Sequence, residues 1–208
     1  MERITTGIRG KAVWGGRRTL AAVAAGVMLS ASGCSEAIRT GQSPGYLVIE
    51  SLQGAPGLNG PFGSTLQSDV LNVDQQTGRT SIAPDRGQAT LTLNMKDPLA
   101  SPSAVNAITV TQYHVEYVRS DGRNVQGVDV PYAFDGAVTA TVSGGATVPF
   151  TLVRIQAKQE APLQALAFGG GANTITTIAR VTFYGHDQNG REVSVSGNIE
   201  VTFSDWAG

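Results

Sequence analysis

Two long stretches of alternating apolar and polar residues near the end of the chain constrain its fold more than any other feature. One face of the first stretch carries Ile175, Thr177, Ala179, Val181 and Phe183. One face of the second carries Val193, Val195, Ile199, Val201 and Phe203. Residues 187–190 between them, Asp-Gln-Asn-Gly, have the composition of a tight turn. Because successive side chains of a strand point to opposite sides, we expect a long β-hairpin with one buried and one solvated face.

Shorter strand patterns precede this hairpin, at residues 46–51, 68–73, 89–95, 107–120, 137–142 and 147–157. Ser143-Gly144-Gly145 separates the last two, which predicts a second hairpin. Residues 128–134 contain Pro131, which is typical of an edge strand or a bulge. Two turn-rich segments, 54–63 and 161–171, are expected to be surface loops. No convincing helix pattern follows residue 33, so the chain is predicted to be all-β, an antiparallel β-sandwich.

From Leu91 to the end, the order of strands and turns resembles bacterial immunoglobulin-like domains, notably in the strand, Asp-x-Asn-Gly turn and strand that close the chain. The paired cysteines of antibody domains are absent. The resemblance implies an immunoglobulin-like sandwich over residues 46–208 and identifies no family of known function. The pattern leaves open whether residues 46–96 and 104–208 form one sandwich.

The beginning of the chain has the composition of an export signal. Arg3, Arg9, Lys11, Arg17 and Arg18 precede an apolar run from Leu20 to Leu29. That run is shorter than the roughly 20 residues of a membrane-spanning helix. Small residues follow it, Ser30-Ala31-Ser32-Gly33, and then Cys34, the only cysteine of the chain. Residues 1–33 are therefore interpreted as a signal peptide, and residues 35–45 as a flexible tether.

This arrangement resembles the lipobox of bacterial lipoproteins, although Ala31 replaces the preferred leucine. The resemblance implies cleavage before Cys34, acylation of its thiol and amino group, and a lipid anchor in the cell envelope. Ser35, in place of a retention aspartate, implies the outer membrane, with the domain facing the periplasm. The alternative is an ordinary secretory peptide that leaves Cys34 as a free thiol. Arg17-Arg18 leaves both the twin-arginine and the general secretory route open.

The charge of the chain after the signal argues against nucleic-acid binding. Ten of the fifteen Lys and Arg residues and fifteen of the sixteen Asp and Glu residues follow position 33, so the net charge there is about −5. Binding to phosphates needs a basic patch, whereas these basic residues are scattered singly.

The sequence offers little catalytic chemistry. His114 and His186 are the only histidines, and no nucleophile motif accompanies them. We therefore expect no enzyme and no cofactor, with a hydrolase that uses one of these histidines as a remote alternative. Two turns carry possible oxygen ligands, one with Asp187, Asn189 and Glu192 and one with Asp121 and Asn124. Neither supplies the six to eight oxygen atoms that calcium needs, so no metal site is expected.

Four aromatic residues are the candidate binding surface, Tyr113 and Tyr117 on one strand face and Tyr132 and Phe134 in the segment after it. The alternative is that they pack in the core with their hydroxyls at the rim. The expected function is a lipid-anchored, non-catalytic binding or structural module of the cell envelope. A second possibility is an accessory subunit of an envelope or secretion assembly that docks through residues 132–134.

Overall fold

The computed structural model describes residues 43–206, except residues 75 and 170–171. The chain divides into two units, residues 1–38 and 39–208, and all described residues belong to the second. The predicted signal peptide and Cys34 lie outside the described residues. Within the described part, no helix is both long and apolar enough to cross a membrane.

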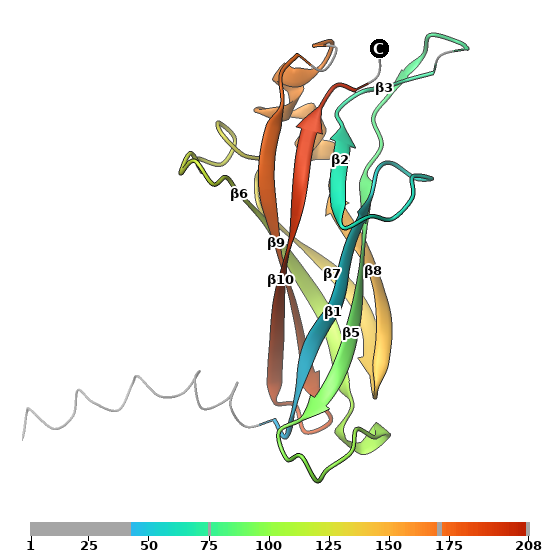
Figure 1. The fold of residues 1–208 in the computed structure, drawn as a ribbon, viewed down its shortest axis with the longest axis vertical. Coiled ribbons are helices and arrows are strands. Elements are labelled where there is room, and N and C mark those ends of the chain that lie inside the picture. Colours follow the sequence, from blue (N-terminus) through green and yellow to red (C-terminus); the bar gives the residue numbers. More distant parts are fainter. Residues whose placement is uncertain (1–42, 75, 170–171, 207–208) are drawn as a thin grey trace, which may run out of the picture. The chain divides into compact units, whose positions relative to one another are not determined.

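Two sheets form the body of this unit (Figure 1). The larger sheet has the strand order β2 (Thr65–Asp69), β10 (Glu192–Ser204), β9 (Ile175–Asp187), β6 (Ile108–Val118) and β7 (Phe134–Val142). The smaller sheet has the order β1 (Gly45–Ala55), β5 (Asp85–Met95) and β8 (Gly145–Val153). A two-stranded ribbon, β3 (Asn72–Val73) and β4 (Thr80–Ser81), projects from the rest. The predicted all-β sandwich is confirmed.

The closing hairpin is confirmed in detail. β9 pairs with β10 from His186 opposite Glu192 to Ile175 opposite Phe203. The apolar face that the alternation predicts is turned to the core, where Val181, Phe183 and Val201 are fully buried. One pair of strands departs from antiparallel order, because β2 runs parallel to the last five residues of β10.

The second predicted hairpin, 137–142 with 147–157, is wrong. β7 pairs with β6 in the larger sheet, whereas β8 pairs with β5 in the smaller one. The chain changes sheets at Ser143-Gly144, and the Gly144 carbonyl accepts a hydrogen bond from the Leu93 backbone N–H (2.7 Å). This crossing allows β7 and β8 to bury their apolar residues from opposite sides of one core, which a flat hairpin does not do.

The expectation of no helix after residue 33 is also wrong. A short helix, α2 (Ile155–Gln159), follows β8, and single turns of 3-10 helix occur at η1 (Ala104–Asn106) and η2 (Leu163–Leu166). α2 takes the end of the segment predicted as strand 147–157. It buries Ala157 and Lys158, so tertiary contacts outweigh local strand propensity here.

Residues 46–96 and 104–208 contribute to the same sandwich. β5 pairs with β8, and β2 pairs with β10, so both parts of the chain supply strands to both sheets. Aromatic rings meet between the sheets, with Phe150 of β8 5.4 Å from Phe183 of β9 in an edge-to-face contact.

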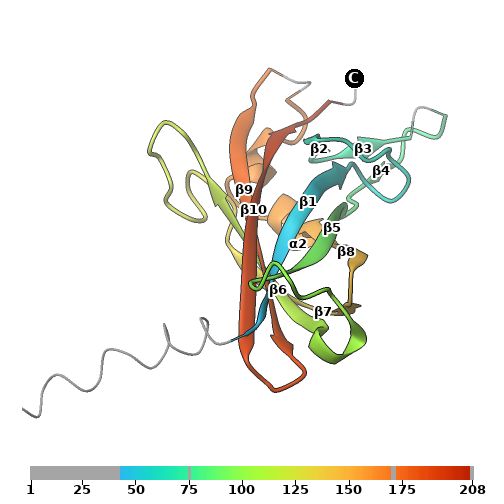
Figure 2. The same ribbon diagram turned by 60° about the horizontal axis from the view of Figure 1, so that its bottom comes forward.

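The strands define two ends of the sandwich. We call the end where β1 begins the base; it also holds the β5–β6 loop and the β9–β10 turn (Figure 1). The opposite, distal end holds the β1–β2 loop, the β3–β4 ribbon, the β6–β7 loop and the segment with α2 and η2. Viewed with the base forward, α2 lies behind the strands, at the far end (Figure 2).

Candidate functional site

Two of the four predicted aromatic residues lie in the core and tie the two sheets together. Tyr117 is 2% exposed, and its hydroxyl donates a hydrogen bond to the Leu152 carbonyl of β8 (2.6 Å). Tyr113 accepts a hydrogen bond from the Thr151 backbone N–H (3.2 Å). Burial raises the pKa of Tyr117, and the nearby charge of Asp85 raises it further. Both hydroxyls are occupied by backbone groups of the facing sheet and do not form a binding surface.

The other two aromatic residues also do not form a shared surface. Phe134 is buried edge-to-face against Tyr113, and the guanidinium of Arg154 lies 4.6 Å from its ring centroid. Tyr132 is 46% exposed. It precedes β7 in the β6–β7 loop, so of residues 128–134, predicted as an edge strand or a bulge, only Phe134 lies in an edge strand. β7 is one edge strand of the larger sheet, and β2 is the other.

The two histidines lie apart on the outer face of the larger sheet. His114 Nδ1 is 2.8 Å from Oδ1 of Asp135, in a pair open to solvent. His186 lines a depression of about 500 Å³ together with Glu192 and Ser194. In the described part of the chain, no hydrogen bond joins the His186 ring to either residue, so the structure offers no assembled nucleophile and base there.

In the two acidic turns, the carboxylates of Asp187 and Asp121 bind groups of their own turn. Asp187 Oδ1 accepts hydrogen bonds from the backbone N–H groups of Asn189 and Arg191, both at 2.9 Å. Burial acts to raise the pKa of Asp187, but these hydrogen bonds and the hydroxyl of Ser43 lower it overall. Asp121 lies between Arg119 and Arg123, and its hydrogen bonds with Arg119 above all hold its pKa far below the ordinary range. Among the described residues, no three His, Cys, Asp or Glu side chains gather into a metal site.

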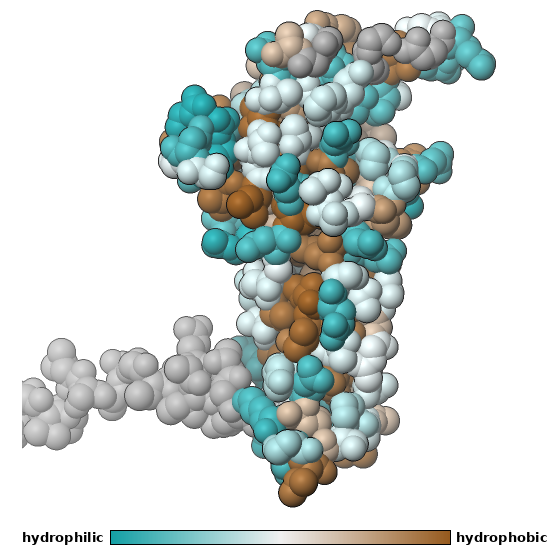
Figure 3. Space-filling model, viewed as in Figure 1, coloured by the Kyte–Doolittle hydropathy of each residue, from teal (hydrophilic) through white to brown (hydrophobic). Residues whose placement is uncertain are grey.

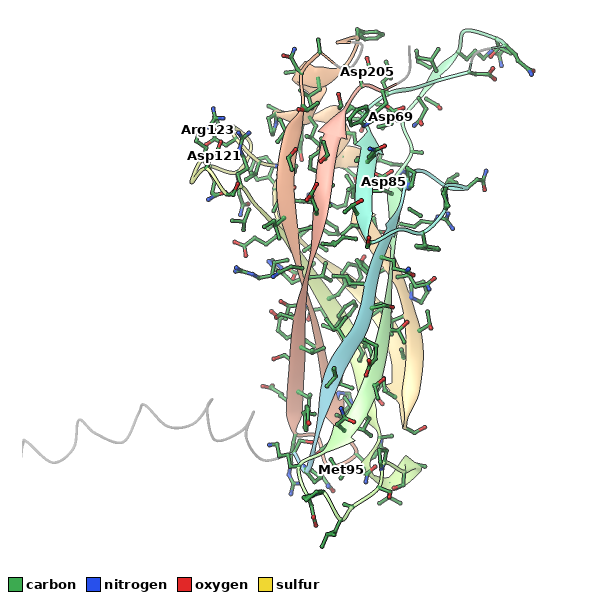
Figure 4. The ribbon with its side chains drawn as sticks, viewed as in Figure 1. Asp69, Asp85, Met95, Asp121, Arg123 and Asp205 are labelled. Carbon is green, nitrogen blue, oxygen red and sulfur yellow. The ribbon has the colours of Figure 1, made fainter. Side chains whose placement is uncertain are left out.

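A buried ion pair that the sequence did not suggest lies near the distal end (Figure 4). Lys158 Nζ of α2 is 2.9 Å from Asp85 Oδ2 of β5, and both side chains are almost completely buried. Ser68 donates to the same carboxylate (2.5 Å), and so does the Gly57 backbone N–H (2.8 Å). Lys158 also donates to the Asp69 carbonyl (2.8 Å). The cluster joins α2, both sheets and the β1–β2 loop, which makes it structural.

Two further carboxyl groups, Asp69 and Asp205, lie beside this cluster. Burial raises the pKa of Asp69, and the charge of Asp205 raises it further, although backbone N–H groups of Trp206 and Leu71 partly oppose the shift. Sequence reasoning missed the whole cluster, because a lone lysine in a polar segment gives no signal of burial.

The best candidate for a binding site is a groove between β1 and β10. It has a volume of about 660 Å³, and its lining is Tyr46, Leu47, Val48, Ile49, Glu50, Ser51, Leu52, Ser64, Val195, Ser196, Gly197 and Asn198. Figure 3 shows a band of hydrophobic surface down the middle of the face where these two strands lie side by side (Figure 1). We call this feature the β1–β10 groove.

A bulge and a glycine shape the floor of the groove. The register of β1 against β5 shifts between Ile49 and Ser51, so Glu50 is the extra residue. The shift turns Ile49 and Leu52 toward the core side, although they are an odd number of positions apart. Both approach Gly197, where a Cβ atom would lie 2.8 Å from Ile49 and 3.4 Å from Leu52. The absent side chain at position 197 therefore allows β1 to approach β10.

The groove is bordered by strand edges that are only partly paired. β2 covers the edge of β10 from Glu200 to Ser204. In the ladders of the described residues, β10 from Glu192 to Ile199 pairs with β9 alone. β1 is likewise an edge strand; it pairs with β5, and beyond that ladder only Gly54 is bridged, to Gly63, among the described residues. Free backbone N–H and C=O groups beside an aliphatic floor are the chemistry that binds an extended peptide.

Comparison with known proteins adds no functional assignment. No family model matches the chain, and no curated protein matches it. One similar solved structure is the X-ray structure of Northeast Structural Genomics Consortium target SoR45, with 10% identity over 77% of this chain and 86% of that chain and a TM-score of 0.32. Another is Spo0M, sporulation control protein, from Bacillus subtilis, with 14% identity over 58% of this chain and 44% of that chain and a TM-score of 0.26.

Proposed function

We propose that this protein is a lipid-anchored, non-catalytic binding module of the cell envelope, held at the outer membrane through Cys34 and facing the periplasm. The basic segment, the apolar run of residues 20–29 and the small residues before Cys34 support export and acylation. A lone cysteine in an exported protein has no partner for an internal disulfide, and acylation removes its exposed thiol.

The binding role is assigned to the β1–β10 groove, and its ligand is an extended segment of an envelope protein partner. The observation that carries this assignment is the half-covered edge of β10, because β2 pairs with one half and leaves Glu192–Ile199 without a second strand. Val195–Asn198 of that uncovered half line the groove. A bound peptide adds backbone hydrogen bonds to this edge and places alternate apolar side chains against Leu47, Ile49 and Val195. The protein then acts as an accessory subunit of an envelope assembly.

Intact mass and membrane fractionation test the anchor. The protein expressed with its own signal is expected in the outer-membrane fraction, with the mass of residues 34–208 plus acyl chains. Cys34→Ala is expected to block removal of residues 1–33, because in the lipoproteins that this chain resembles the signal peptide is cleaved after the cysteine thiol has been acylated. A soluble, unacylated product of the unaltered protein contradicts the proposal.

Photo-crosslinking in cells tests the groove. A benzoylphenylalanine at Glu50 or Ser64, both exposed at the groove, is expected to give one adduct of defined mass with a protein partner. The matched control is the same residue at Glu116 of β6, on the outer face of the larger sheet. Equal adducts from the groove and the control, or none from either groove position, contradict a peptide site there.

A further inference from the structure

The chain enters the described domain at a fixed point of the base. Ser43 is buried, its hydroxyl acts to lower the pKa of Asp187 in the β9–β10 turn, and it accepts a hydrogen bond from the Gly45 backbone N–H (3.4 Å). The described part of the chain therefore begins at the base of the sandwich.

The β5–β6 loop lies directly beside this point. We call residues 96–107 the basal loop. The Lys96 backbone N–H donates to the Pro44 carbonyl (2.9 Å), and Tyr46 pairs with Asn94 at the end of β5. At its other end, the Ala107 carbonyl accepts a hydrogen bond from Gln188 of the β9–β10 turn (3.2 Å). Met95, immediately before the loop, marks its place at the base in Figure 4.

Large apolar side chains of the basal loop are exposed to solvent. Leu99 is 93% exposed and Val105 is 83% exposed, the highest values among the large hydrophobic residues of the described part. No charged residue occurs from Pro98 to Ala107. The loop is held by its own hydrogen bonds, from the Leu99 backbone N–H to Asp97 (2.9 Å) and from the Ser103 backbone N–H to Asn106 (2.6 Å). Its apolar residues are thus presented outward and do not fold back on the domain.

The length of chain before Ser43 limits which surface the anchor keeps near the bilayer. Eight residues, Ser35 to Gln42, separate the proposed acylation site from Ser43, and the nine steps from Cys34 to Ser43, at most about 3.6 Å each, give a span of about 30 Å. β1 alone has 11 residues, which at about 3.3 Å each extend about 36 Å from the base toward the distal end. Because this segment is shorter than β1 and joins the sandwich at its base, a lipid anchor at Cys34 keeps the base closer to the membrane than the distal end.

We propose that the basal loop is a membrane-contact site that inserts Leu99 and Val105 into the lipid surface beside the anchor. This inference rests on the proposed acylation of Cys34. The uncharged stretch from Pro98 to Ala107, with its two exposed aliphatic side chains, suits the boundary between headgroups and acyl chains, while Lys96 and Asp97 stand at the start of the loop. The contact fixes the sandwich upright, with the β1–β10 groove open to the side and the distal loops away from the bilayer.

Depth-dependent fluorescence quenching tests this contact in the full, acylated protein. Because Cys34 is the only cysteine and its thiol is acylated, Leu99→Cys supplies the single reactive thiol for an NBD dye. Matched controls carry the dye at Thr77→Cys in the β3–β4 turn or at Thr139→Cys on β7, both exposed. In vesicles of phosphatidylethanolamine and phosphatidylglycerol, spin-labelled lipids are expected to quench the dye at position 99 severalfold more than at positions 77 and 139.

The possible outcomes separate the two proposals. Protein that floats with the vesicles but shows equal quenching at all three positions, or stronger quenching at 77 or 139, overturns the basal contact and leaves the anchor standing. Protein that stays in solution, with a thiol at Cys34 that also takes the dye, overturns the anchor and the contact with it. Val105→Asp in the Leu99→Cys background is expected to reduce the quenching at position 99, because it places a carboxylate where the acyl boundary lies.

Discussion

Buried polar side chains hold this sandwich together at the residue scale. The hydroxyl of Tyr117 reaches across the core to the Leu152 carbonyl, and Lys158 reaches from α2 to Asp85. Each of these polar groups has a partner, as burial requires. The partners belong to different sheets or to a helix and a sheet, so these contacts fix how the layers meet.

Replacement of one member of the ion pair is expected to be costly. Lys158→Met leaves the carboxylate of Asp85 buried without its counter-charge and should lower the free energy of unfolding by about 3–5 kcal/mol. The double variant Lys158→Met/Asp85→Leu removes both charges and should recover most of that loss. Urea unfolding followed by circular dichroism measures the cycle. A single variant as stable as the unaltered protein would show that the pair carries no net interaction.

At the scale of single elements, the β9–β10 turn is stabilised by one carboxylate, and the edge of β10 is only partly paired. The β9–β10 turn is closed by the Asp187 carboxylate, which accepts hydrogen bonds from the Asn189 and Arg191 backbone N–H groups. The edge of β10 is shared between β2 and the groove. The Asp187 carboxylate therefore stabilises the turn that joins β9 to β10.

Acid should weaken the contribution of this turn. The folded pKa of Asp187 is lowered, so its stabilisation is present above the unfolded pKa of about 3.9 and is lost as the pH falls through the folded value. Asp187→Asn should therefore lower the free energy of unfolding by about 1 kcal/mol at neutral pH, because it removes charge-assisted hydrogen bonds. The difference from the unaltered protein should vanish in strong acid.

Thermal unfolding at a series of pH values measures this difference. The control is Glu192→Gln, which removes the same charge at an exposed neighbouring position and should leave stability nearly unchanged. An effect of Asp187→Asn that is constant down to strong acid would show that shape, and not charge, matters at this turn.

At the scale of the whole molecule, the first and second parts of the chain, residues 46–96 and 104–208, both contribute strands to each sheet of the sandwich. β1 and β5 come from the first part of the chain and β8 from the second, yet all three form one sheet. β2, from the first part, completes the other sheet beside β10. Neither part holds a complete core by itself.

Residues 43–208 are accordingly expected to unfold in one cooperative transition, with near-UV and far-UV circular dichroism changing together. The fragment 104–208 lacks β5, whose Gly87 lies against the ring of Phe150, and should show the poorly dispersed amide spectrum of an unfolded chain in NMR. A well-dispersed spectrum from that fragment would mean that the larger sheet folds without its partner.

Much of the fold could be predicted from the chain, and little of the candidate site. The β9–β10 hairpin followed from its alternation, because a strand with one buried face must place apolar residues at every second position. Most of the aromatic residues predicted to form a binding surface lie in the core. An aromatic side chain with a polar end occurs both in cores and at surface rims, and the sequence pattern around it is the same in the two cases. The groove gave no composition signal, since aliphatic residues that line an open edge look like ordinary core residues.

By itself, the sequence determined the all-β class, the closing hairpin and the long strand β6, since these depend on local alternation and turn residues. Only the tertiary structure decided that β7 and β8 lie in different sheets, that β2 runs parallel to β10, and that Lys158 is buried. The physical reason is that strand pairing, the closeness of Gly197 to β1 and the partner of a buried charge depend on contacts between residues far apart in the chain. A local pattern carries no information about which distant edge a strand meets.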